Sequence, residues 1–142
     1  VSGVTSTPFG GAYSGSKAAV HMLSDALRME LAPFGVRVIT VQPGAIESRF
    51  GENASKGVER YAEGSLYSQV HDAIEARAGA SQVGSMPAVD FARLVVGAAT
   101  APSPPAIVRA GKHSVRLPVI GRLPTALRDR IFRRRFDLER LQ

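Results

Sequence analysis

The sequence of 142 residues contains no cysteine, which excludes disulfide bonds and thiolate metal sites. Its three histidines, His21, His71 and His113, lie far apart, and this spacing argues against a metal site. No apolar run approaches the roughly 18 residues that a transmembrane helix needs. No signal peptide opens the chain, and its first residue is Val1 instead of methionine, which suggests a fragment or a processed product. We therefore expect a globular protein that is cytoplasmic or peripherally bound to a membrane.

Acidic residues are scarce in the last quarter of the chain. From Arg109 onward, ten Lys or Arg residues stand against three acids, a net charge of +7, whereas the preceding residues carry −1. The body is thus neutral, and an electrostatic partner would meet the tail. Nucleic-acid binding would need a basic surface that leads into a groove, and the neutral body argues against it.

The first third of the chain predicts one helix and one buried strand. Apolar residues cover a broad surface of the predicted helix over residues 13–32, with His21, Asp25 and Arg28 on a wetter side. The β-branched run VRVITV, residues 36–41, predicts a strand packed on both faces. A helix, a tight turn and a buried strand make half of a parallel α/β unit.

The middle of the chain is less regular. Residues 47–87 are polar and contain several glycines, with weak helical stretches over 54–66 and 67–78. A segment this long between core elements predicts a lid or specificity insert. A helix over 91–99 and a short strand over 107–110 follow.

The tail predicts a second amphipathic helix within LPTALRDRIFRRRFDLERLQ. Its apolar stripe at helical spacing comprises Leu123, Leu127, Ile131, Leu138 and Leu141. Phe132 and Phe136 then fall on the far side. One interpretation is a helix that lies on an anionic membrane surface or closes over a lipid substrate. The interpretation that we favour is a helix docked on its own domain, with a solvated basic face.

A tyrosine and a lysine stand four residues apart where a glycine-rich loop meets the first helix, in GGAYSGSKAAV. Residues i and i+4 share a helix face, so Tyr13 and Lys17 point the same way. An ammonium stabilises a phenolate, and the positive end of the helix dipole acts in the same sense. Such a phenol can give a proton to a carbonyl oxygen or take one from a hydroxyl. Taken alone, the pair is more typical of an exposed helix surface than of a functional site.

Three segments together resemble the short-chain dehydrogenase/reductase family: GAYSGSKAAV, then SDALRMELAPFGVRV, then VQPGAIESRF. The resemblance runs from Val1 to about Gly111 and implies an α/β fold, the C-terminal part of a Rossmann-like, doubly wound parallel sheet. It implies that residues 1–111 are half of an NAD(P)-binding domain, in which 47–87 form the substrate lid. Residues 112–142 would be a basic helical extension.

The resemblance also implies roles for single residues. Tyr13 would be the general acid/base in hydride transfer between a nicotinamide and a carbonyl or alcohol, assisted by Lys17. The residues that contact the cofactor would be Tyr13, Lys17, Pro43, Gly44, Ile46 and Ser48. Ser48 stands where the family usually has threonine and keeps the hydroxyl. The implied cofactor is NADP or NAD, with NADP favoured.

Other parts of the family pattern are missing. The family's catalytic serine lies thirteen residues before the tyrosine, which falls one position before Val1. The phosphate-binding loop and the residue that selects NAD or NADP also belong upstream, and no G-x-x-x-G-x-G follows a strand here. We therefore expect a C-terminal fragment of an oxidoreductase, poorly folded and inactive alone because its strand would expose an unpaired apolar edge.

Substrate and partners are implied more loosely. Residues that could line a pocket for an apolar substrate, or equally pack against the body, are Phe50, Tyr61, Leu66 and Tyr67. The segment EARAGASQ and the C-terminal ending resemble family branches that act on steroids, acyl-dihydroxyacetone phosphate or related lipids. The helix over 13–31 commonly packs in a subunit interface in this family, which implies a homo-oligomer. The alternative is a non-enzymatic remnant that binds an anionic membrane or nucleic acid through its basic tail.

Overall fold

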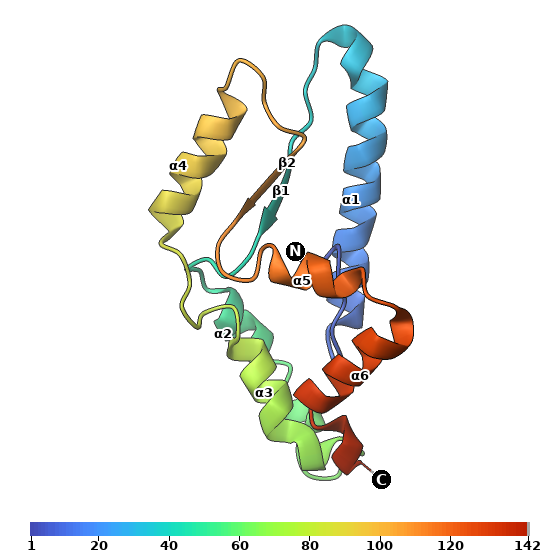
Figure 1. Ribbon diagram of the computed structural model, residues 1–142. Helices are drawn as coiled ribbons and strands as arrows, with labels where there is room; N and C mark the ends of the chain where they lie inside the picture. Colours follow the sequence, from blue (N-terminus) through green and yellow to red (C-terminus); the bar gives the residue numbers. More distant parts are fainter. Residues whose placement is uncertain (142) are drawn as a thin grey trace.

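The computed structural model describes residues 1–141, and it has the α/β architecture predicted from the sequence (Figure 1). The helices and strands are α1 (Gly11–Leu31), β1 (Thr40–Pro43), α2 (Phe50–Ser55), α3 (His71–Gly79), α4 (Ala88–Ala99), β2 (Ile107–Ala110), α5 (Arg116–Gly121) and α6 (Thr125–Arg135). Short 3₁₀ helices are η1 (Ala32–Phe34), η2 (Glu59–Tyr61), η3 (Ser68–Val70) and η4 (Leu138–Arg140). In Figure 1, α1 and α4 flank the sheet, and α2, α3 and α6 gather beyond the carboxyl ends of its strands.

The sheet contains the two parallel strands β1 and β2, with Thr40 opposite Ile107 and Pro43 opposite Ala110. The strand predicted over 107–110 is confirmed. The strand predicted over 36–41 is wrong at its start, because β1 begins at Thr40 and residues 36–39 are exposed or half-buried. In this register those residues would face 103–106, where Pro104 and Pro105 have no N–H to donate.

The first helix forms where it was predicted, but its apolar side is exposed and its predicted wet side is turned toward the protein. Gly35, with φ +73°, follows the helix and turns the chain toward β1. The predicted wetter side, His21, Asp25 and Arg28, is half-buried, whereas Met22 is 66% exposed and the neighbouring apolar side chains are exposed with it. The prediction of the wet face is therefore wrong for this chain, because the described residues include nothing that packs on the apolar face.

The main hydrophobic core lies in the lid segment, residues 47–87, rather than around the sheet. Val58, Val70, Ile74 and Ala78 form one buried cluster, and α3 packs on α2. Leu138 and Leu141 of the tail pack against this cluster. The lid is thus joined to the C-terminal segment by apolar contacts.

The tail docks on the body by a different face from the predicted one. Phe132 and Phe136 are buried, whereas Leu127, in the predicted stripe, is 46% exposed. The helix ends at Arg135, and Asp137 has φ +52°, so Leu138 and Leu141 no longer continue the helical spacing of Leu127. The predicted stripe is wrong for this reason. The docked helix keeps Arg130 and the run 133–135 exposed, as in the interpretation we favoured, whereas Arg128 is half-buried.

No helix among residues 1–141 is both long enough and apolar enough to cross a membrane.

Candidate active site

Tyr13 lies in the first turn of α1, and the N-terminal end of this helix lies on the side toward which the parallel strands point (Figure 1). The Lys17 Nζ is 5.5 Å from the centroid of the Tyr13 ring. The Tyr13 side chain is 40% exposed, so its hydroxyl can meet a ligand. The structure therefore brings the predicted tyrosine and lysine together on one accessible helix face.

A buried amide links α1 to both strands. Gln42 on β1 is 3% exposed, and its Oε1 accepts a hydrogen bond from Arg109 Nε on β2 at 2.7 Å. Its Nε2 lies 3.4 Å from His21 Nδ1 on α1. Burial, then the charge of the Val1 amino group and that of Arg109, lowers the pKa of His21 against the opposing effect of Asp25. Sequence analysis passed over Gln42 and Arg109, although a polar residue directly before Pro43-Gly44 was the available signal.

The chain makes a close backbone turn directly after β1. Gly44 N–H donates to Ala110 O at 2.8 Å, and Ala45 N–H donates to Lys112 O at 2.9 Å. A Cβ added to Gly44 would overlap the carbonyl oxygen of Lys112, so glycine is required there. The predicted Pro43-Gly44 turn thus lies at the carboxyl end of β1, which is the end where parallel α/β sheets bind ligands.

Ile46 has main-chain groups that point away from its neighbour. Ile46 forms a parallel bridge with Met86, in which Glu47 N–H donates to Met86 O and Met86 N–H donates to Ala45 O. A parallel bridge of this kind directs the N–H and C=O of Ile46 to the other side. The Ser48 hydroxyl lies 3.4 Å from Ile46 O. The hydroxyl thus donates to Ile46 O, whereas Ile46 N–H makes no backbone hydrogen bond within residues 1–141.

The four predicted substrate residues separate into three groups. The Phe50 ring is 5.3 Å from the Tyr13 ring, centroid to centroid. Tyr61 and Tyr67 contact each other and Phe9, at the loop before α1. Leu66 is 91% exposed and takes no part in these contacts. The structure therefore places Phe50 against Tyr13, whereas Tyr61 and Tyr67 pack on Phe9 of the loop before α1.

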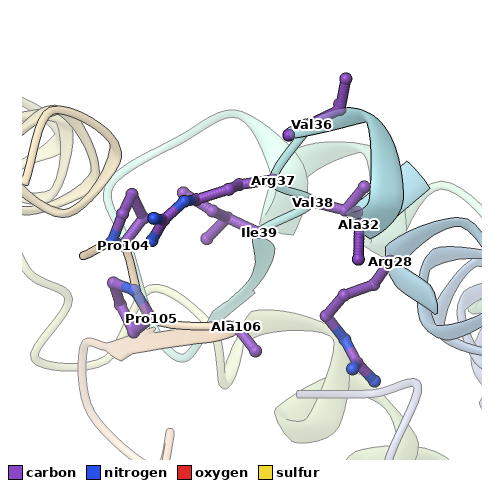
Figure 2. Close-up of a pocket in the computed structure, with 10 residues that line it drawn as sticks. Arg28, Ala32, Val36, Arg37, Val38, Ile39, Pro104, Pro105 and Ala106 are labelled. Atoms are coloured by element: carbon purple, nitrogen blue, oxygen red, sulfur yellow. The ribbon is translucent and has the colours of Figure 1, made fainter. Parts of the chain in front are cut away.

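A cleft of about 350 Å³ lies at the opposite end of the sheet from Tyr13 (Figure 2). The residues that line it include Arg28, Val38 and Pro105, around the start of β1. At this end of the strands, the segment that contains Pro104 and Pro105 does not pair as a strand with residues 36–39. The cleft is thus a gap beside the shortened sheet and is separate from the candidate site.

Comparison with known proteins gives the family. A family model for short chain dehydrogenases matches residues 1–59, the part that carries Tyr13, Lys17 and the Pro43-Gly44 turn. A short-chain dehydrogenase/reductase of Pestalotiopsis microspora is 37% identical over 106 residues, 72% of this chain and 40% of that protein. The chain belongs to the short-chain dehydrogenase/reductase family. Further short-chain dehydrogenase/reductase relatives extend the match along the whole chain.

The short-chain dehydrogenase fogD of Aspergillus ruber is 30% identical over 143 residues, which cover all of this chain and 49% of that protein. An NADPH-dependent 3-dehydrocapnine reductase of Ornithobacterium rhinotracheale is 37% identical over 76 residues, 51% of this chain and 27% of that protein. The chain thus spans about half the length, or less, of these curated relatives. No solved structure matches the chain significantly.

Membership of this family implies dependence on a nicotinamide cofactor, and the residues after β1 fit one. A nicotinamide carboxamide has one carbonyl acceptor and two N–H donors, which complement the N–H and C=O of Ile46. These two groups make no hydrogen bond to another backbone group within residues 1–141. The Ile46 carbonyl already accepts from the Ser48 hydroxyl at 3.4 Å, so a bound carboxamide would share or displace that contact there.

Proposed function

We propose that this chain is the catalytic half of an NAD(P)-dependent oxidoreductase that interconverts a carbonyl and an alcohol. The observation that carries the proposal is the Tyr13–Lys17 pair, with Lys17 Nζ 5.5 Å from the Tyr13 ring centroid, at the carboxyl end of β1. The pair is accessible there, and the Pro43-Gly44 turn and Ile46 follow the same strand.

The chemistry follows from these groups. A bound reduced nicotinamide supplies the hydride. Tyr13 Oη donates its proton to the carbonyl oxygen, which takes up the π electron pair and becomes the alcohol oxygen. Lys17 carries a positive charge that stabilises the phenolate left behind, and its ammonium can also donate to the ribose hydroxyls. Pro43, Gly44 and Ile46 would hold the nicotinamide ring and carboxamide, with Ser48 beside them. In the reverse direction Tyr13 accepts the alcohol proton.

A complete enzyme would need a partner for this chain. We assign residues 1–111 to the C-terminal half of a Rossmann-like domain, with 47–87 as its substrate lid, and 112–142 to a basic helical extension. The exposed apolar face of α1 would then pack against the half that binds the cofactor phosphates, or against a second copy in a homo-oligomer. Alone, the chain would be inactive.

We also propose which cofactor and which class of substrate the enzyme uses. The relative named as NADPH-dependent supports NADP over NAD. Phe50, whose ring contacts Tyr13, would meet an apolar part of a carbonyl substrate, in keeping with a steroid or lipid. Burial of Phe132 and Phe136 leaves α6 without a fully exposed apolar stripe, so the membrane-binding alternative gains no support. We propose a cytoplasmic enzyme.

The proposal is tested in the full-length protein with NADPH and NADH and a panel of aldehydes and ketones, by following cofactor oxidation. Tyr13→Phe should lower kcat by about 10²-fold to 10⁴-fold, because the proton donor is lost. Lys17→Met should lower kcat as well. Arg93→Met, which removes an exposed cation of α4, serves as the control, with kcat nearly unchanged. Full turnover in Tyr13→Phe would overturn the assignment.

A further inference from the structure

The loop before Tyr13 is attached to the lid by an arginine. Arg77 on α3 donates from Nε to Thr7 Oγ1 at 3.2 Å, although the two residues are 70 positions apart. A Cβ added to Gly10 would overlap the terminal nitrogen of Arg77, so the guanidinium lies directly on the loop backbone. Among the ion pairs of residues 1–141 none involves Arg77. The described polar contact of this half-buried cation is thus with the loop itself.

A second attachment is aromatic. The Phe9 ring lies 5.2 Å from the rings of both Tyr61 and Tyr67, edge-on to each, and 6.2 Å from the ring of Phe136. These partners belong to the lid and to the tail, and Phe136 is buried. Edge-to-face aromatic pairs at such distances are favourable beyond the area they bury. One side chain of the loop therefore joins three separate parts of the chain.

The backbone at this attachment is strained. Phe9 has φ +60°, a left-handed conformation that the Cβ of an L residue disfavours. Such a conformation persists only where surrounding contacts fix it, and it concentrates at functional sites. The rings around Phe9 provide those contacts. Tyr13 follows four residues later, with Gly10 as the N-cap and Gly11 as the first residue of α1.

We propose that Arg77 and Phe9 are positioning residues, which hold the loop Thr7–Gly10 against the lid and thereby fix where the Tyr13 hydroxyl stands. The proposal rests on the function proposed for Tyr13. Neither residue touches the reacting atoms. Their effect is to exclude loop conformations in which α1 begins at another angle, since an error of about 1 Å at a catalytic group can cost 10²-fold in rate.

Two adjacent glycines provide a matched test. Gly10→Ala makes the Arg77 guanidinium, the end of a flexible side chain, move off the loop, whereas Gly11→Ala meets nothing within 4 Å. Gly10 has φ −123°, which alanine also adopts, so backbone strain does not confuse the comparison. Amide hydrogen exchange of residues 7–13 in the full-length protein should rise about tenfold in Gly10→Ala only, with kcat reduced and the KM for cofactor little changed.

A second background shows whether Arg77 is the cause. In Arg77→Met the flexible thioether yields to the added methyl, so Gly10→Ala should bring no further rise in exchange. Phe9→Gly keeps the positive φ and removes the ring, and it should raise exchange of the same amides, while Phe9→Tyr should restore protection. Arg93→Met, on exposed α4, is the control for loss of an arginine.

The outcomes separate this proposal from the previous one. Equal exchange in Gly10→Ala and Gly11→Ala, or an unchanged loop in Arg77→Met and Phe9→Gly, would overturn the positioning role even if Tyr13 proves essential. If the variants changed the free energy of global unfolding as much as they changed local exchange, the positioning role would also be overturned. The residues would then only stabilise the fold. Activity retained in Tyr13→Phe would instead overturn the proposed function and leave the exchange result standing.

Discussion

Glycine is required by close backbone contacts where β1 and β2 end. A Cβ on Gly44 would overlap Lys112 O, and one on Gly111 would overlap Ala45 O and the Ile46 side chain. Gly111 also has φ +87°. The two glycines therefore let the turns after the parallel strands pass against each other, and Ile46 is held by the same contacts.

At this scale we predict opposite effects of two glycine substitutions in the intact protein. Gly44→Ala should lower the free energy of unfolding by about 1–3 kcal/mol, because the backbone must move to admit a methyl group. Gly97→Ala, in the last turn of α4 with nothing within 4 Å, should raise it by up to about 1 kcal/mol. Urea unfolding measures both. Equal stabilities for Gly44→Ala and the parent protein would contradict the close contact seen here.

The sequence was sufficient for single residues only where the relevant neighbours are local. Tyr13 and Lys17 meet because residues four apart share a helix face, which needs no knowledge of the rest of the fold. Arg77 and Thr7 meet because the lid folds back on the loop, a contact over 70 positions that no local pattern signals. Whether Tyr13, Lys17 and the residues after β1 act as predicted stays a prediction.

Among the secondary-structure elements, the tail shows how one residue changes a helical face. The left-handed Asp137 ends the regular spacing, so that α6 packs through Phe132 and Phe136 while η4 sends Leu138 and Leu141 to the lid core. Helical periodicity drawn through this break selects the wrong stripe. The packing of α6 therefore depends on its phenylalanines.

The two possible faces of α6 are distinguished by a pair of truncations. Phe132→Ala should destabilise the protein by about 3 kcal/mol, since this ring is 8% exposed. Leu127→Ala should stay within about 0.5 kcal/mol, because Leu127 is largely open to solvent. Chemical denaturation, followed by limited proteolysis of the tail, measures the difference. A larger loss in Leu127→Ala would instead favour the stripe expected from the sequence.

Long-range partners also decide which predicted strands form. The strand over 107–110 was predicted correctly from its own residues and its glycine stop. The run VRVITV has equal β propensity, yet its first four residues stay outside the ladder because their register partners include Pro104 and Pro105. The buried side of α1 likewise depends on what covers it, and its amphipathic pattern alone could not show this.

At the scale of the whole molecule, packing is uneven. The lid and tail share a buried cluster that includes Val70, 1% exposed, whereas α1 and α4 bury almost none of their apolar residues. Apolar faces of this extent on two helices mark an interaction surface. The described residues thus combine one well-packed region with one that depends on further contacts.

This unevenness predicts a local difference in stability between the chain alone and the full-length protein. Amide hydrogen exchange in α1 should be fast in the chain alone and much slower in the full-length protein, because its apolar face becomes covered. Exchange in α3, packed within the lid, should change far less and is the internal control. Equal protection of α1 in both proteins would contradict the proposed packing partner.

The parallel pairing of β1 with β2 also has a kinetic consequence. Gln42 and Arg109, joined across the two strands, are 67 positions apart, so the sheet closes only after a long loop has lost its conformational freedom. Contacts within the lid and within each helix are local and form sooner. During synthesis and refolding, the backbone N–H and C=O groups of β1 therefore stay unpaired until β2 has formed. The chain is most prone to aggregation during this interval.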